Sequence, residues 1–215
     1  FMNTAKLPPL FIDSTPTKND RMDDFEALVK SKIQNEDFDF SNFIFPKGYD
    51  FTDISFSGST SFRDAVFHGE SLLFRNAKFE CDLVDFTGVN FSVKVVRFDK
   101  AIFRSKKLVL KNITVKGDFF SFIGARFEKG KNIFNHFEVN SFTGFHLSGC
   151  YVGDGAELNF SDLTIHGSTF DIQGSRIEGE LFRLDSVNFH CKTVKLGADF
   201  RGKVVTINNC LFNSS

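Results

Sequence analysis

Large apolar residues recur along the chain with a period of twelve. Between residues 62 and 103 one pattern is repeated four times: a phenylalanine, a small or β-branched residue three positions later, and a second phenylalanine two positions after that. The opening residues are Phe62, Phe74, Phe86 and Phe98. A fixed period of this kind is typical of a solenoid, in which each repeat packs against its neighbours.

The spacing of these apolar residues favours strands over helices. Within a repeat they follow one another at steps of two, three, two and five, which leaves no continuous face on a helix. Pairs such as Ala65 and Phe67 instead show the two-residue period of a strand. Glycines two positions after the second large residue, including Gly69 and Gly117, predict turns between strands.

The chain divides into three predicted segments. Residues 1–18 contain three of the four prolines and show no periodicity, so we expect an arm or linker. Residues 19–37 contain Met22, Phe25, Val29 and Ile33 at helical spacing, which predicts an amphipathic helix over 21–33. This helix would cover the open end of the repeats, which fill residues 38–215.

The repeats resemble those of a known family. Each divides into two five-residue units plus two more residues, as in LLFRN and AKFEC at residues 72–81. This resembles the pentapeptide-repeat family, whose unit is a small residue, any residue, Leu or Phe, and two more. The resemblance covers about residues 38–213 and implies a right-handed β-helix. Because the first unit has a large residue in the small position and each pair carries two extra residues, we expect a wider and less square coil.

Two repeats form each coil in this interpretation, which gives 24 residues per coil and about seven coils in an all-β solenoid. A twelve-residue coil would be too narrow to hold two Phe rings at normal packing density. A left-handed fold with a six-residue repeat is excluded because the steps between large residues alternate between five and seven. We predict that large–large and small–large faces alternate around the coil. The side chains predicted to point inward include Phe62, Phe67, Phe74 and Phe79.

Composition narrows the possible functions. The chain has 31 Phe, 2 Tyr and no Trp, which suits a dry interior better than a recognition surface. Its net charge of −1 favours neither direct nucleic-acid binding nor attachment to a membrane surface. The sequence has neither an apolar run long enough for a membrane span nor a signal peptide, so we expect a cytoplasmic protein or one secreted by a non-classical route.

One surface column carries histidines. The position directly after the second large residue is occupied by His68, Lys116, His166 and His190 on different repeats. A 24-residue coil places His166 and His190 on adjacent coils, close enough for a metal site or a proton relay. Since no carboxylate or cysteine completes a ligand set in this column, we expect a solvated ladder and no metal or cofactor.

The same position on the alternate repeats carries charged residues. We expect one face of the solenoid to be mainly acidic and the opposite face to be mainly basic or neutral. The residues of the charged column are Glu80, Arg104, Glu128 and Glu178.

The remaining polar residues have structural interpretations. Cys150 and Cys210 occupy the small position and should be inert, whereas Cys81 and Cys191 lie at corners and would react only if exposed. Corner Asp and Asn residues are expected to bond to nearby backbone amides. These corner residues are Asp53, Asp64, Asn76, Asn112, Asp162 and Asn209. We find no catalytic constellation, and insertions of one residue leave little room for a substrate cleft, so we do not expect an enzyme.

The sequence favours a non-enzymatic protein-binding or scaffold module, because a solenoid displays regular columns of side chains to a partner. The resemblance implies an alternative, a DNA mimic that inhibits or protects a type II topoisomerase such as gyrase. However, the repeat region holds 20 acidic and 21 basic residues, without the negative charge of DNA. A third alternative is the repeat domain of a larger bacterial effector. The last repeat, residues 207–212, has no visible cap, which leaves a homodimer through this coil open.

Overall fold

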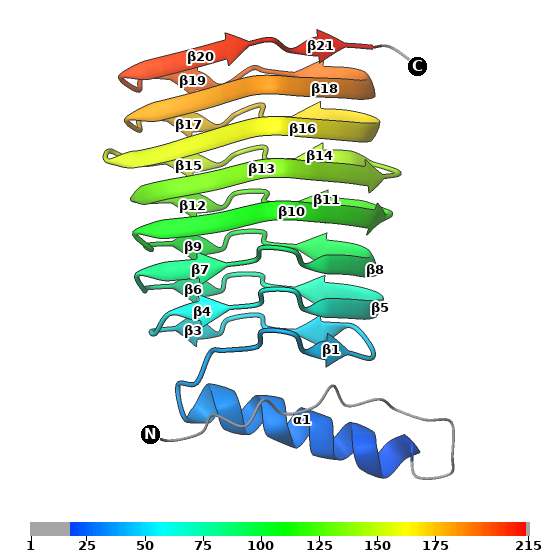
Figure 1. Ribbon diagram of the computed structural model, residues 1–215. Coiled ribbons are helices and arrows are strands. Elements are labelled where there is room, and N and C mark those ends of the chain that lie inside the picture. The colour runs from blue at the N-terminus through cyan, green and yellow to red at the C-terminus, as the bar shows by residue number, and fades with distance from the viewer. Residues whose placement is uncertain (1–17, 214–215) are drawn as a thin grey trace.

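The computed structural model describes residues 18–213, which form one α-helix followed by a β-helix of about seven coils (Figure 1). All strand pairs are parallel, and the coil is right-handed as it rises from the helix toward the C-terminal end. The predicted all-β solenoid with an N-terminal helical cap is confirmed.

Two parallel sheets make up the wall of the solenoid. The smaller has seven strands and follows one side of every coil. Its strands are β3 (Ser55–Phe56), β6 (Lys78–Phe79), β9 (Ile102–Phe103), β12 (Arg126–Phe127), β15 (Tyr151–Val152), β17 (Arg176–Ile177) and β19 (Asp199–Phe200).

The larger sheet has 14 strands and wraps around the remaining sides. Its strands are longer in the C-terminal half. There a single strand covers the part of a coil that two short strands cover in the coils nearer the helix. They are β1 (Ile44–Phe45), β2 (Tyr49–Asp50), β4 (Thr60–Ser61), β5 (Val66–Leu73), β7 (Leu83–Asp85), β8 (Asn90–Arg97), β10 (Lys107–Gly117), β11 (Phe119–Ser121), β13 (Gly130–Ser141), β14 (Gly144–His146), β16 (Ala156–Asp171), β18 (Leu181–Lys195), β20 (Val204–Asn208) and β21 (Leu211–Phe212).

The strand register sets the length of a coil. Phe79 lies opposite Phe103, and Lys107 lies opposite Lys131, so each of these coils contains 24 residues. Between Lys131 and Glu157 the coil lengthens to 26 residues. The predicted 24-residue coil is therefore confirmed for the regular part of the array.

Phenylalanine rings stack in ladders inside the first coils. Phe56, Phe79, Phe103 and Phe127 follow one another with ring centroids 4.7, 5.0 and 5.2 Å apart. A second ladder joins Phe51, Phe74, Phe98 and Phe122, with centroids 4.8, 4.8 and 4.6 Å apart. Shorter ladders join Phe40, Phe62 and Phe86, and Phe45, Phe67 and Phe91. The four side chains predicted to point inward are fully buried, which confirms that prediction.

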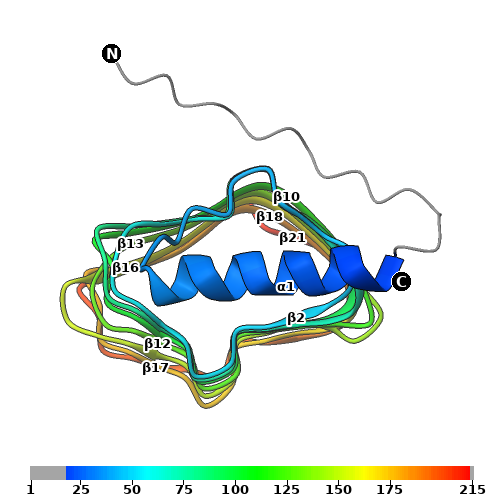
Figure 2. The same ribbon diagram turned by 90° about the horizontal axis from the view of Figure 1, so that it is seen from below.

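The helix α1 (Lys18–Gln34) closes the first coil. Phe25 and Val29 are buried, and the Phe25 ring lies 5.4 Å from Phe45 and 6.2 Å from Phe43. Viewed along the axis, the helix lies across the open end of the coil (Figure 2). The predicted cap is confirmed, although the helix begins three residues earlier than expected, at Lys18. The predicted arm otherwise lies outside the described residues.

Residues with left-handed backbone conformations recur in two columns, each at a bend of the coil. The first column of residues with positive φ is Asn42, Asp64, Gly88, Asn112, His136, Asp162, Ser186 and Asn209, and the second is Asp53, Asn76, Lys100, Gly124, Gly149 and Gly174. Glycine, asparagine and aspartate tolerate this conformation better than other residues. The corner positions predicted from the sequence therefore carry the bends.

The expected hydrogen bonds of these corner residues are not the ones observed. Several backbone amides are bonded instead to the side chain of a residue that directly precedes a large apolar residue. Asp50 Oδ1 accepts from the Thr52 amide at 2.8 Å, and Asp85 Oδ1 accepts from the Thr87 amide at 2.8 Å. A corner side chain such as Asn76 bonds between coils, with Nδ2 3.0 Å from Asp53 Oδ1. The prediction was wrong because the side chain of such a corner residue points toward a neighbouring coil and not toward its own backbone.

Candidate functional site

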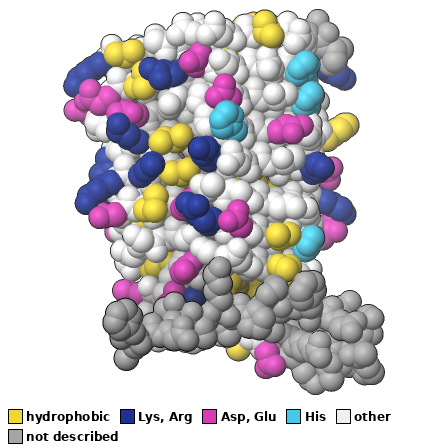
Figure 3. Space-filling view, in the orientation of Figure 1, with side chains coloured by type: hydrophobic (Ala, Val, Ile, Leu, Met, Phe, Trp, Pro, Cys, Tyr) yellow, Lys and Arg dark blue, Asp and Glu magenta, His cyan; other side chains and the backbone are white. Residues whose placement is uncertain are grey.

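The histidine column forms as the sequence predicts. His166 lies opposite His190, and the two rings stack with centroids 4.7 Å apart and planes 11° apart. Lys116 lies opposite Asn140, which lies opposite His166, while His68 lies opposite Ser92. In Figure 3 histidine side chains lie toward the right of the face, and a further histidine lies near its middle.

This column lacks the geometry of a metal centre. Parallel rings direct their nitrogens side by side, whereas a metal ion needs ligands that converge on one point. Within residues 18–213 no group of three His, Cys, Asp or Glu side chains is placed to hold a metal ion. The two histidines therefore act as a stacked pair on the surface.

The charged column differs from the expected acidic face. Arg104 lies between two carboxylates, with Nη1 2.6 Å from Glu80 Oε1 and Nε 2.6 Å from Glu128 Oε2. Arg126, from the adjacent column, lies 2.9 Å from Glu128 Oε1. The expectation of a mainly acidic face is corrected here, because basic side chains one coil or two residues away neutralise the carboxylates.

The same network continues along the smaller sheet to Glu178. Tyr151 donates its hydroxyl to Glu178 Oε2 at 3.0 Å, and this hydrogen bond raises the pKa of the tyrosine. The Arg126 guanidinium lies over the Tyr151 ring, 4.7 Å from its centroid. Arg176 holds the other Glu178 oxygen at 2.7 Å and lowers the pKa of that carboxyl. Because these charged and polar side chains bond to one another, the network holds adjacent coils together.

The four cysteines carry free thiols. Cys150 is buried and donates to the Phe122 carbonyl oxygen at 3.0 Å, and burial raises the pKa of its thiol to about 12. Burial also raises the pKa of Cys81, Cys191 and Cys210. Protonated thiols are poor nucleophiles, which supports the prediction that Cys150 and Cys210 are inert.

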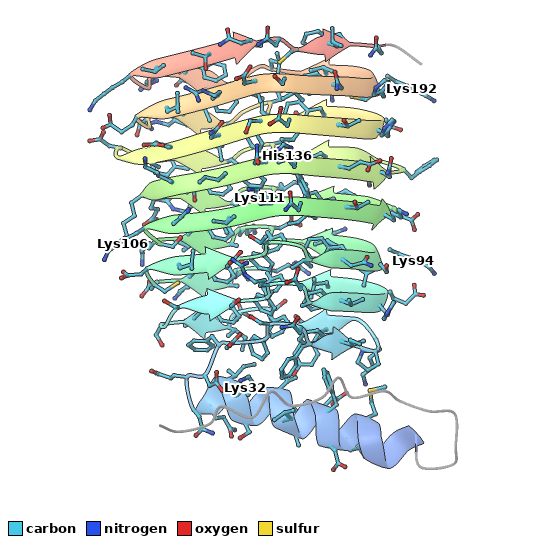
Figure 4. The ribbon with its side chains drawn as sticks, viewed as in Figure 1. Lys32, Lys94, Lys106, Lys111, His136 and Lys192 are labelled. Carbon is cyan, nitrogen blue, oxygen red and sulfur yellow. The ribbon has the colours of Figure 1, made fainter. Side chains whose placement is uncertain are left out.

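A groove that sequence analysis missed crosses β10, β13 and β16. It is shallow, has a volume of about 590 Å³, and is lined by Asn112, Ile113, Thr114, His136, Phe137, Glu138, Asp162 and Thr164. Figure 4 shows His136 and the neighbouring Lys111 in the middle of this face of the larger sheet.

Two neighbouring columns of side chains form the groove. The first contains residues 112, 136 and 162, which share the left-handed conformation with φ of 54, 48 and 52°. The second contains Thr114, Glu138 and Thr164, which lie directly opposite one another. The groove therefore follows the bend in the strands from one coil to the next.

Neighbouring side chains orient the two carboxylates of the groove. Asn135 Nδ2 donates to Asp162 Oδ2 at 3.2 Å, and His136 Nδ1 lies 3.8 Å from the same oxygen. Asn140 Nδ2 donates to Glu138 Oε1 at 2.7 Å. In the sequence this site is visible only as a run of polar residues around each bend. The coil length must be known before one can tell which of these residues are neighbours.

Comparisons of the chain with family models, with curated proteins and with solved structures found no match. The resemblance to pentapeptide repeats thus rests on the residues of the chain itself. Across residues 18–213 no helix is both long and apolar enough to cross a membrane.

Proposed function

We propose that the chain is a non-enzymatic protein-binding or scaffold module of the pentapeptide-repeat type. The observation that carries this proposal is the wide face formed by β10, β13, β16 and β18, strands of 11, 12, 16 and 15 residues. Their parallel register aligns outward side chains in columns along the solenoid. Such a surface is rigid before a partner arrives, so little conformational entropy is lost on binding.

An apolar patch on this face is the best contact point for a protein partner. The patch consists of Leu83, Val109 and Ile133, of which Val109 and Ile133 lie opposite each other and are half-buried, while Leu83 is 36% exposed. Lys107 and Lys131 lie beside it, and Figure 3 shows basic side chains around the apolar ones. This combination suits a folded protein with an apolar contact and an acidic rim.

Site-specific photocrosslinking tests this assignment. With the crosslinking group at Val109, we expect one protein to be captured in cells of the source organism, and capture to be lost when Ile133→Asp is added. The matched control is Ile102→Asp, a half-buried aliphatic residue on the smaller sheet. Failure to capture a protein, or equal capture with Ile133→Asp, would contradict the proposal.

The observed ion pairs do not favour a DNA mimic. Glu80 and Glu128 bind Arg104, Lys106 lies 2.9 Å from Asp82, and Lys203 lies 2.6 Å from Glu180. A DNA-like surface needs carboxylates that lack basic neighbours. A gyrase supercoiling assay tests this alternative: inhibition or quinolone protection at stoichiometric concentration would support the mimic.

We also propose that the last coil pairs with a second copy of the chain. Among the described strands β20 pairs with β18 alone, so its other edge presents backbone groups that a second β20 could pair with. The apolar residues of this coil are 41–58% exposed: Val204, Val205, Ile207, Leu211 and Phe212. Light scattering should give a dimer that Leu211→Asp converts to a monomer, whereas a monomeric parent chain would refute this pairing.

A further inference from the structure

The polar groove on the larger sheet has a composition suited to binding. Its two columns offer an amide, two hydroxyls, an imidazole and two carboxylates across three successive coils. Among the described residues, the side-chain hydrogen bonds at the groove are made by Asp162 and Glu138, and none is made by the side chains of Asn112, Thr114 and Thr164. They are therefore available to a ligand without the loss of an internal bond.

The carboxylates are held ready for hydroxyl donors. Asp162 Oδ2 is fixed by Asn135, and Glu138 Oε1 is fixed by Asn140. Within residues 18–213, no hydrogen bond reaches Asp162 Oδ1 or Glu138 Oε2, so each carboxylate keeps one acceptor for a ligand. A side chain that is already oriented by its neighbours loses little entropy when it binds.

The same groove is unsuited to other ligand classes. The carboxylates of Glu138 and Asp162 would repel the phosphates of a nucleic acid. An extended peptide needs pockets for alternate side chains, whereas the floor residues Ile113 and Phe137 are each only 1% exposed. A metal ion is disfavoured because no three ligands converge among the described residues.

We propose that this groove binds a neutral glycan, a chain of sugar rings that runs along the solenoid axis. Sugar hydroxyls both donate and accept, which matches the mixture of carboxylate, amide and hydroxyl groups here. Successive coils present their polar groups about 4.8 Å apart, the spacing of neighbouring strands. A polymer whose units have a similar length would meet a polar partner on each of the three coils, with a different chemical group on each coil.

A screen of neutral oligosaccharides followed by titration calorimetry tests the glycan site. We expect binding to the parent chain, and at least a tenfold loss of affinity in the double variant Thr114→Val and Glu138→Gln, which removes a hydroxyl and a charge but preserves side-chain volume. The matched control is Thr193→Val with Glu157→Gln, on the same sheet and outside the groove.

Three outcomes would overturn the proposal. The first is the absence of binding to any neutral oligosaccharide at millimolar concentration. The second is an equal loss of affinity in the groove variant and the control variant, which would place the ligand elsewhere. The third is binding of a lysine-rich peptide alone, which would assign the groove to a basic protein segment. Circular dichroism of both variants establishes that the β-helix is intact.

Discussion

Phe79 and Phe103 lie one coil apart with their ring centroids 5.0 Å apart and their planes 1° apart. Both are fully buried, and each continues the ladder to a further ring above or below. Replacing Phe103 by alanine leaves a cavity that β9 cannot close without breaking its pairing with β6 and β12. We expect Phe103→Ala to lower the free energy of unfolding by about 3–5 kcal/mol in urea denaturation.

Phe142→Ala is the matched control, since this side chain is 78% exposed. Its free energy of unfolding should change by no more than about 0.5 kcal/mol. A similar loss in both variants would contradict the view that the stacked rings carry the stability of the solenoid.

Asn132 occupies an interior position where the neighbouring coils have Leu108 and Leu158. Its Nδ2 donates to the Glu157 carbonyl oxygen at 3.0 Å, but its buried Oδ1 has no partner within the described chain. An unsatisfied buried acceptor is costly, so Asn132→Leu should raise the free energy of unfolding by about 1 kcal/mol. Thermal unfolding measures this, and a lower melting temperature would show that the amide bonds to the backbone matter more.

Lys100 adopts φ of 58° in a column that elsewhere contains Asp, Asn and Gly. A lysine in the left-handed backbone conformation is strained, and glycine relieves this strain. Lys100→Gly should therefore raise the free energy of unfolding by up to about 1 kcal/mol, even though glycine also makes the unfolded chain more flexible. The control Lys107→Gly, within β10, should lower it by about 0.5–1 kcal/mol. Destabilisation by both substitutions would argue against strain at residue 100.

Asp85 gives the solenoid an acid-sensitive contact. Its side chain is only 7% exposed, and this burial by itself raises the pKa of the carboxyl. Hydrogen bonds from Thr87 and Arg63 outweigh burial and place the folded pKa below its ordinary value. The contribution to stability is thus present above the pKa of unfolded aspartate, about 3.9, and is lost as pH falls through the folded pKa.

Urea midpoints measured at a series of acidic pH values test this contact. Asp85→Asn should flatten the fall in stability below about pH 4, because an amide cannot be protonated there. An unchanged slope in the variant would show that other carboxylates dominate acid unfolding.

The fold was predictable because phenylalanine is used repeatedly at equivalent positions. Rings such as Phe74 and Phe98 must occupy the same place in successive coils in order to stack, so the spatial repeat is visible in the sequence as a period. The pairing of His166 with His190 followed from the same register. A buried polar residue such as Asn132 could not be predicted in this way. Buried positions were identified from the repeat of apolar residues, and Asn132 interrupts that repeat.

The surface was harder to predict for a physical reason. Contacts there depend on which columns are neighbours, and a coil that lengthens from 24 to 26 residues shifts those columns. Glu128 was assigned to an acidic face, yet Arg104 and Arg126 both reach it across short distances. The groove was missed because His136 belongs to the bend, a position that the sequence associates with Asn, Asp or Gly.

The phenylalanine ladders end partway along the solenoid. Above Phe122 and Phe127 the equivalent positions are Leu147 and Val152, and within residues 18–213 no strand lies above the last coil. Because each coil is stabilised mainly by its neighbours, a single copy of the chain should fray from the C-terminal coil and refold from the coils next to the helix. In the monomeric Leu211→Asp variant, amide protons of β20 should therefore exchange with solvent first, and those of β6 and β9 last.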